Sequence, residues 1–167
     1  MKIRKKTLAF LSVLLLLNSC KEQHEVTPAT YSLLLTGDTE KSWQQTSFTF
    51  IFDDTEVDPI DANRIYGIPD CALDDIYKFV REGKQLEIYD GNNKCNPDND
   101  DLLVRTSWDI VNANANLFLG GGQPYILAKL TNDSLVYGFR DTLIAPVADA
   151  TFWEFPGVAQ WVYKPSN

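Results

Sequence analysis

Residues 102–110 read Leu-Leu-Val-Arg-Thr-Ser-Trp-Asp-Ile, and this stretch decides the fold class. One face of this stretch is mostly apolar and contains Leu102, Val104, Thr106, Trp108 and Ile110, and the opposite face contains Arg105, Ser107 and Asp109. Successive side chains of a β-strand point to opposite sides, so a period of two predicts a strand that is buried on one side. The alternating phenylalanines of Phe48–Phe52 predict a second strand with an aromatic face.

Further strands on both sides of this stretch are grouped into two local hairpins. Turn-forming residues join the two halves of each hairpin, Glu82-Gly83-Lys84 in the first and Asn132-Asp133 in the second. The first hairpin is expected to pair Ile76–Arg81 with Gln85–Tyr89, and the second to pair Tyr125–Thr131 with Ser134–Arg140. Two single strands are expected at Leu117–Leu119 and Trp161–Tyr163. Short strands joined in this way predict an all-β domain, either an antiparallel up-and-down β-barrel or a β-sandwich.

One short helix is expected before the strands. Residues 31–35 are largely apolar, Pro28 stands just before them and Gly37 follows them. Proline suits the first turn of a helix, and glycine suits the position after its last residue. We therefore expect residues 31–167 to form a single β-barrel domain with a short N-terminal helix, because about 140 residues supply one core and not two.

The first 19 residues have the pattern of a signal peptide. A basic start at residues 2–6 is followed by the apolar run Leu8–Leu17. As a helix this run rises about 15 Å, half of the roughly 30 Å hydrocarbon core of a membrane, so it is too short to span. The run ends in Leu17-Asn18-Ser19-Cys20, which resembles the lipobox of bacterial lipoproteins. The resemblance implies cleavage before Cys20 and lipidation of its thiol.

Residues 20–30 are polar and are interpreted as a tether between the lipidated Cys20 and the domain. Several acyl chains make such an anchor effectively permanent, so a membrane is the first expected partner. The charged residues Lys21, Glu22 and Glu25 resemble a surface-export signal of some gram-negative lipoproteins. We expect a lipid-anchored protein of the cell envelope, in the outer membrane, without a prediction of which face it occupies.

The charge of the chain argues against nucleic-acid binding. The leader holds four of the fifteen basic residues and no acidic residue, which leaves 11 basic against 23 acidic side chains and a formal charge of −12. An acidic domain without a basic patch repels phosphate backbones.

Two cysteines remain after Cys20. In an oxidising compartment an even number predicts pairing, so we expect a Cys71–Cys95 disulfide that closes a loop of about 25 residues.

The order of features in residues 33–136 resembles that of small lipocalin-like lipoproteins of gram-negative bacteria. The matching pieces are Leu33-Leu34-Leu35-Thr36-Gly37, Lys41-Ser42-Trp43, Cys71, Asp74-Asp75-Ile76-Tyr77-Lys78-Phe79, Gly83, Cys95, Ser107-Trp108, Tyr125-Ile126, Leu130-Thr131 and Asp133-Ser134-Leu135-Val136. The resemblance implies an up-and-down barrel whose closed base contains Trp43. It also implies an arginine over the Trp43 ring, and Arg140 at the end of its strand is the candidate.

Catalytic chemistry is not expected. His24 is the sole histidine and lies in the tether, so histidine-based nucleophilic catalysis and a histidine-ligated zinc site lack their central residue. Asp74 and Asp75 are adjacent, and adjacent residues of a strand face opposite sides, so we expect a solvated acidic pair and no shared site. We predict no enzyme activity, no cofactor and no metal.

The segment from residue 90 to 101 is dense in Asp and Asn. Asp90, Asp98 and Asp100 are therefore considered as calcium ligands. Because Asp, Asn, Gly and Pro also form turns, and because the spacing does not fit an EF-hand, a disulfide-pinned turn is the preferred interpretation.

The abundance of aromatic residues suggests a ligand site, and Trp108, Trp153 and Trp161 are the candidate contacts. Aromatic side chains also fill small barrels, which leaves two hypotheses open. The first is a lipid-tethered binding module for a small apolar or glycan ligand. The second is an interaction lipoprotein with a filled barrel that contacts another envelope protein.

Overall fold

The computed structural model describes residues 28–98, 100–111, 115–146 and 152–166. The expected signal peptide and Cys20 lie outside these residues. The elements are α2 (Pro28–Thr36), β1 (Glu40–Phe52), β2 (Ile60–Asp61), β3 (Ile76–Val80), β4 (Gln85–Tyr89), β5 (Leu102–Val111), β6 (Asn116–Leu119), β7 (Tyr125–Leu130), β8 (Leu135–Pro146) and β9 (Phe152–Pro165). Two 3₁₀ turns, η1 (Asp70–Ala72) and η2 (Glu82–Lys84), connect strands.

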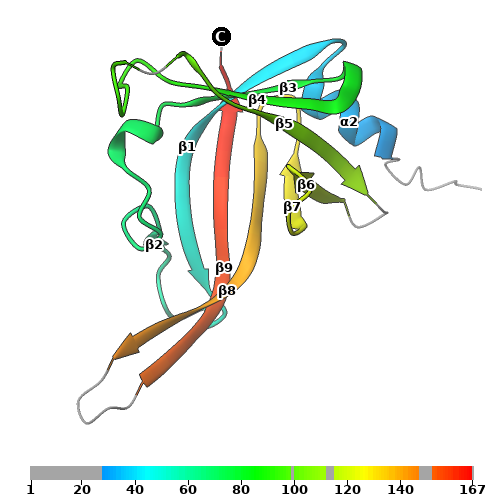
Figure 1. Cartoon of the computed structure of the whole chain (residues 1–167). Coiled ribbons are helices and arrows are strands. Elements are labelled where there is room, and N and C mark those ends of the chain that lie inside the picture. Colours follow the sequence, from blue (N-terminus) through cyan, green and yellow to red (C-terminus); the bar gives the residue numbers. More distant parts are fainter. Residues whose placement is uncertain (1–27, 99, 112–114, 147–151, 167) are drawn as a thin grey trace, which may run out of the picture.

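Eight of the strands form a closed antiparallel ring (Figure 1). The ring runs in chain order from β3 to β9, and β1 closes it by pairing with both β3 and β9. The short β2 pairs with the outer part of β1, beyond the reach of β3. Because the sheet closes on itself, the architecture is barrel-like and the alternative of two stacked sheets does not hold.

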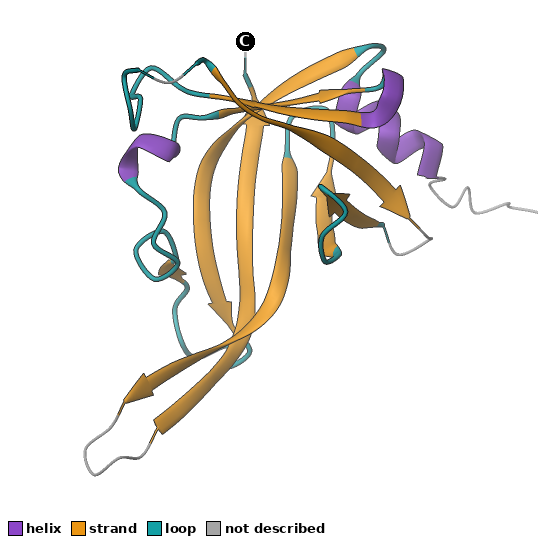
Figure 2. Cartoon of the chain, viewed as in Figure 1, coloured by secondary structure: helices purple, strands orange, loops and turns teal. Residues whose placement is uncertain are grey.

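The ring has one tall wall and one low wall. β1, β8 and β9 contain 13, 12 and 14 residues, whereas β6 and β7 contain 4 and 6. The outer ends of β8 and β9 extend past the ring as a two-stranded hairpin (Figure 2). We call its described residues, Thr142–Pro146 and Phe152–Pro156, the projecting hairpin.

Two groups of buried side chains form the core. The larger group lies inside the ring, where Trp43, Phe79 and Trp108 pack with leucines from β4 to β8. The smaller group lies on the tall wall around Phe48 and Phe50, and Trp161 contacts both groups. Burying the faces that the alternating sequence defines provides the main free energy of folding.

Most of the predicted elements are confirmed, including the N-terminal helix and the strands from β3 to β7. The largest differences lie in β1, which begins at Glu40, and in β8 and β9, which end and begin in the projecting hairpin. Pro156 and Gly157 interrupt the strand pattern of β9 in the sequence. In the fold, the Pro156 carbonyl accepts a bond from the Asp53 amide, and a Cβ on Gly157 would lie 2.3 Å from the Ile51 carbonyl oxygen. Close strand contact therefore requires glycine there.

A charged cluster covers the outer face of β3, β4 and β5. Its centre is Glu87, whose side chain is 8% exposed. The Glu87 carboxylate pairs with Lys78 at 2.8 Å and Arg105 at 2.8 Å, and accepts a hydrogen bond of 2.7 Å from the Tyr89 hydroxyl. The Lys78 bond and then the Tyr89 bond lower the pKa of Glu87 to about 2.

We predict that the stability contribution of the Glu87 charge depends on pH. An unfolded glutamate has a pKa of about 4.3, so the folded state is favoured above that value and loses this advantage as the pH falls towards 2. Urea unfolding at several pH values should show the wild type more stable than Glu87→Gln at neutral pH, with the gap narrowing below about pH 5. Glu82→Gln on an exposed turn is the control, and a gap that does not change with pH would contradict the prediction.

Candidate functional site

Trp43 lies fully buried at the base of the ring. Its Nε1–H donates a hydrogen bond of 2.9 Å to the Leu35 carbonyl of α2, so the helix and the indole hold each other. The cation over the ring belongs to Lys41, whose Nζ lies 4.2 Å from the ring centroid and donates to the Asn132 carbonyl. Burial lowers the pKa of Lys41, with Asp133 acting in the opposite direction.

The prediction that Arg140 covers Trp43 is wrong. Arg140 lies opposite Val158 on β9, whereas Trp43 lies opposite Pro165, and seven residues of strand separate these positions by about 23 Å. β8 begins at the base with Leu135 and runs away from the base, so its later residues lie towards the opposite end of the ring. There Arg140 pairs with the Asp53 carboxylate.

The three tryptophans predicted as ligand contacts do not come together. Trp108 is 2% exposed, donates to the Val80 carbonyl at 3.0 Å and is part of the core. Trp161 is partly buried and stacks on Phe48 with ring centroids 4.2 Å apart. Trp153 lies on the projecting hairpin and is 63% exposed. A single tryptophan-lined ligand site is therefore not formed by these residues.

Tyrosines fill the middle of the ring above Trp43. The Tyr137 and Tyr163 rings are stacked, and their hydroxyl oxygens lie 2.9 Å apart. Tyr77 packs edge-on against Tyr163. Burial raises the pKa of all three phenols, so they remain neutral and satisfy one another by hydrogen bonding. This part of the interior is occupied by the protein's own side chains.

Tyr66 packs against the smaller core group on the tall wall and was not predicted as a functional residue. Its ring contacts Phe48 and Phe139, and its hydroxyl donates a 2.7 Å bond to Asp141. Burial, and then this bond, raise the pKa of Tyr66. Residues 53–70 also contain Val57, Ile60, Ala62 and Ile65, so no pattern in the sequence singles out Tyr66. The loop that carries Tyr66 packs on the smaller core group.

The projecting hairpin carries the most exposed large apolar side chains among the described residues. Ile144, Phe152 and Trp153 are each 63% exposed. The Trp153 ring contacts Phe155, and Phe155 contacts Phe52 at the edge of the ring, so an aromatic row continues from the core onto the hairpin. A concentration of apolar surface of this kind marks an interaction site in soluble proteins.

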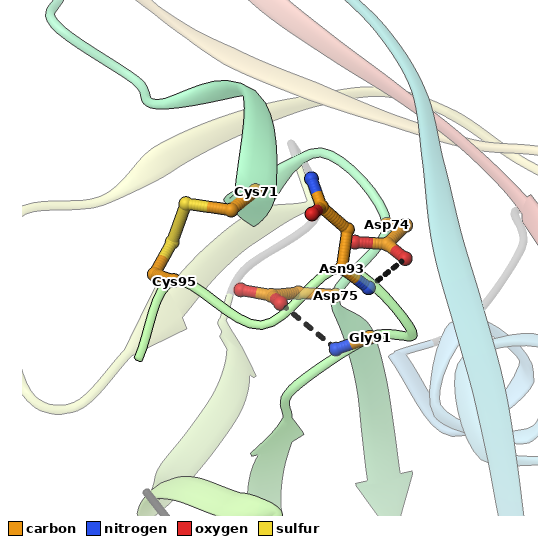
Figure 3. The surroundings of a disulfide bond; sticks show 6 residues. All are labelled: Cys71, Asp74, Asp75, Gly91, Asn93 and Cys95. Atoms are coloured by element: carbon orange, nitrogen blue, oxygen red, sulfur yellow. Dashed lines mark hydrogen bonds between the residues drawn. A yellow bond between two sulfur atoms is a disulfide. The ribbon is translucent and has the colours of Figure 1, made fainter. Parts of the chain in front are cut away.

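The predicted Cys71–Cys95 disulfide is present, and it joins the acidic loop between β4 and β5 to the 3₁₀ turn η1, which precedes β3 (Figure 3). Asp75 accepts a bond of 3.2 Å from the Gly91 amide, and Asp74 accepts one of 3.0 Å from the Asn93 amide. The expectation of a solvated acidic pair is wrong for Asp75, which is 6% exposed. Both residues precede β3, outside strand geometry, and this allows them to face the same loop. Burial is the main cause that raises the pKa of Asp75.

Gly91 is required by the close approach of the Asp74 carboxylate. A Cβ at this position would lie 2.3–2.5 Å from the Asp74 carboxylate atoms. We predict that Gly91→Ala lowers the free energy of unfolding by about 1–3 kcal/mol through overpacking. Denaturant unfolding of the single variants and of the Gly91→Ala, Asp74→Ala double variant should show a smaller cost of the glycine change once Asp74 is shortened. An equal cost in both backgrounds would contradict this explanation.

The described residues of the same loop do not form a set of calcium ligands. His, Cys, Asp and Glu side chains of the described residues form no group of three or more that could hold a metal ion, so Asp90, Asp98 and Asp100 do not converge. Asp98 is exposed, and its amide donates to the Asn96 side chain as in a turn. Beside the loop lies an open pocket of about 490 Å³, with Gln44, Asp74, Asp90, Lys94 and Asp101 in its lining.

No described helix is long and apolar enough to cross a membrane. No protein-family model, no curated protein and no solved structure matches this chain. The fold and the exposed surfaces therefore define a structural class: a barrel-like antiparallel β protein with a disulfide-linked loop near its base and an apolar hairpin at the opposite end.

Proposed function

We propose that this protein is a lipid-anchored protein of the cell envelope that acts by binding another protein molecule, with the projecting hairpin as its contact surface. The proposed location in the cell envelope rests on the sequence, which contains a signal-peptide pattern, the lipobox-like segment ending at Cys20 and a polar tether. A disulfide is consistent with the oxidising compartment that this location implies. Mass spectrometry of the mature N-terminus should find a diacylglyceryl adduct on Cys20, and a free thiol there would contradict the anchor.

The exposure of the projecting hairpin is the observation that supports the binding role. Ile144, Phe152 and Trp153 leave most of their apolar surface in water, although the ring behind them is well packed. Keeping such residues exposed costs solubility and contributes little to folding. A contact that buries them gives a physical reason for their presence.

The position of the hairpin supports the same role. The helix α2, which follows the tether, lies at the base of the ring, and the hairpin extends from the opposite end (Figure 1). An anchor at the tether therefore presents the hairpin away from the point of attachment. The interior of the ring near its base is occupied by Trp43, Trp108 and the stacked tyrosines, which favours surface binding over enclosed binding.

Photo-cross-linking tests this function directly. The full chain carrying p-benzoylphenylalanine in place of Trp153 is irradiated in intact gram-negative cells, and covalent protein adducts are detected through a tag on the chain. We expect adducts from this position. Val104 on β5, which is 43% exposed, is the control position for the same cross-linker and should give few. The absence of protein adducts at position 153 would overturn the proposed contact surface.

A small-molecule binding role, as in the lipocalin-like family that the sequence resembles, is the second candidate. The supporting observation is a set of partly buried aromatic rings, Tyr125, Phe139 and Trp161, which contact one another on the inner side of β7, β8 and β9. Flat rings of this kind bind apolar or glycan ligands. Native mass spectrometry of gently extracted protein should then show a co-purifying molecule, and a ligand-free mass would argue against this role.

A further inference from the structure

Glu154 lies among the exposed apolar side chains of the projecting hairpin. It is directly opposite Ile144 in the β8–β9 register, and Phe152 is the next residue but one along β9, so the three side chains share one face of the hairpin. Side chains directly opposite each other are about 5 Å apart, and alternate residues of a strand are about 7 Å apart. A surface that covers both apolar side chains therefore also covers the Glu154 carboxylate.

No basic side chain of the described residues neutralises this carboxylate by an ion pair. Residues 53–61, 139–146 and 152–158 form this end of the molecule, and the Asp53 amide bonds to the Pro156 carbonyl at the root of the hairpin. Their one basic residue, Arg140, is already paired with the Asp53 carboxylate. Their acidic residues are Asp53, Asp54, Glu56, Asp58, Asp61, Asp141 and Glu154. The apolar hairpin is therefore bordered by negative charge.

A partner that covers Ile144 and Phe152 also removes water from Glu154. Removing an ionised carboxylate from water is strongly unfavourable unless an opposite charge and hydrogen bonds compensate it. We propose that the partner of the projecting hairpin is a protein segment with a basic side chain between apolar residues, and that this basic side chain pairs with Glu154. The inference rests on the proposed function, because it names the chemistry of the protein that the hairpin contacts.

Arginine suits this position better than lysine. Its planar guanidinium donates two parallel hydrogen bonds to one carboxylate, whereas lysine acts as a point charge. A guanidinium also stacks on aromatic rings, and the Phe152 ring is on the same face as Glu154. The surrounding carboxylates attract a basic segment before contact and raise the rate at which it finds the hairpin.

A membrane and a second copy of this chain suit the same face less well. Insertion of Ile144 and Phe152 into a bilayer would bring the Glu154 carboxylate into or beside the hydrocarbon, and anionic lipids would meet an acidic surface. A second copy that used the same face would bring its own Glu154 and the same acidic border, and like charges in an interface disfavour association.

Fluorescence anisotropy with synthetic peptides tests the inference. The full chain, purified in mild detergent, is titrated into a labelled short peptide in which arginine and leucine alternate, and we expect binding. Glu154→Lys should weaken this binding at least tenfold, because it sets like charges against each other. Glu82→Lys makes the same change of net charge at an exposed position of η2 and should change the affinity less than twofold. Circular dichroism shows whether each variant is folded.

Two further peptides separate the charge from the apolar contact. A peptide that alternates glutamate with leucine should not bind, because it adds a second carboxylate opposite Glu154. A peptide that alternates arginine with serine should bind at least tenfold more weakly than the arginine–leucine peptide. Ile144→Ser should weaken binding of the arginine–leucine peptide, whereas Val104→Ser, at a similarly apolar exposed position on β5, should leave it unchanged.

The contrary outcomes separate this inference from the proposed function. Equal weakening by Glu154→Lys and Glu82→Lys, equal binding of the acidic peptide, or no binding by the folded wild type would each overturn the inference. The proposed function would still stand if the cross-linker at position 153 gives protein adducts in cells. Adducts there that join two copies of this chain would also overturn only the inference. Adducts with lipid in place of protein would overturn both.

Discussion

Replacing Trp43 with alanine should lower the free energy of unfolding by about 3–5 kcal/mol, the usual cost of removing a large buried aromatic side chain. The indole is completely buried, so its loss leaves a cavity between α2 and the core. The substitution also leaves the Leu35 carbonyl without the bond that Nε1–H donates, and removes the ring under Lys41. These effects add to the cavity and place the expected value in the upper part of the range.

Equilibrium urea unfolding followed by circular dichroism measures this effect. Trp153→Ala is a matched control, because it deletes the same side chain from a position that is 63% exposed, and it should change stability by less than about 0.5 kcal/mol. Trp43→Phe should fall between the two, since it keeps most of the ring and loses the donor. A change below about 1 kcal/mol in Trp43→Ala would mean that the base of the ring is not closed by this residue.

Removing the disulfide through the paired substitution Cys71→Ala and Cys95→Ala should cost about 3 kcal/mol, because the crosslink closes a loop with a sequence separation of 24. The main reason is the larger conformational freedom of the unfolded chain once the loop is open. The bonds from Asp74 and Asp75 to the loop backbone remain available, so the folded ring itself should survive.

The same unfolding experiment, with and without reductant, tests the disulfide. Reduced wild type and the double variant should unfold at the same lower urea concentration, and reductant should not affect the double variant. Hydrogen exchange adds a local readout: the amides of Gly91 and Asn93 should exchange faster in the double variant, while those of β9 should follow the global change. An unchanged midpoint in the double variant would contradict the prediction.

Local sequence patterns were sufficient for most of the fold. The alternation in residues 102–110 and the turn residues around Gly83 predict strands because they depend only on which side chains face the core. The outer parts of β8 and β9 lack this signal. Their faces are apolar on both sides and contain Pro156 and Gly157, so no period of two singles out a buried face.

The candidate site was less accessible from the sequence, because it depends on contacts between distant residues. The burial of Asp75 follows from a loop that the disulfide brings against it, and no property of residues 74–75 alone reports that. The choice of Arg140 as the cation over Trp43 assumed that β8 returns to the base. Lys41, only two residues before Trp43, occupies that place because alternate residues of one strand share a face.

The closure of the ring by its first and last strands has a consequence for how the protein is made. β1 pairs with β9 from Trp43 opposite Pro165 to Phe52 opposite Gly157, so the seam joins the two ends of the domain (Figure 1). During synthesis the hairpins from β3 to β7 can form early, yet the seam waits for the final residues to emerge. Until then the edge of β1 that pairs with β9 is open, and β9 does not yet pack against Phe48 and Phe50. A chain that stops before β9 is therefore a substrate for chaperones and proteases, and the last strand sets the moment at which the protein becomes resistant to both.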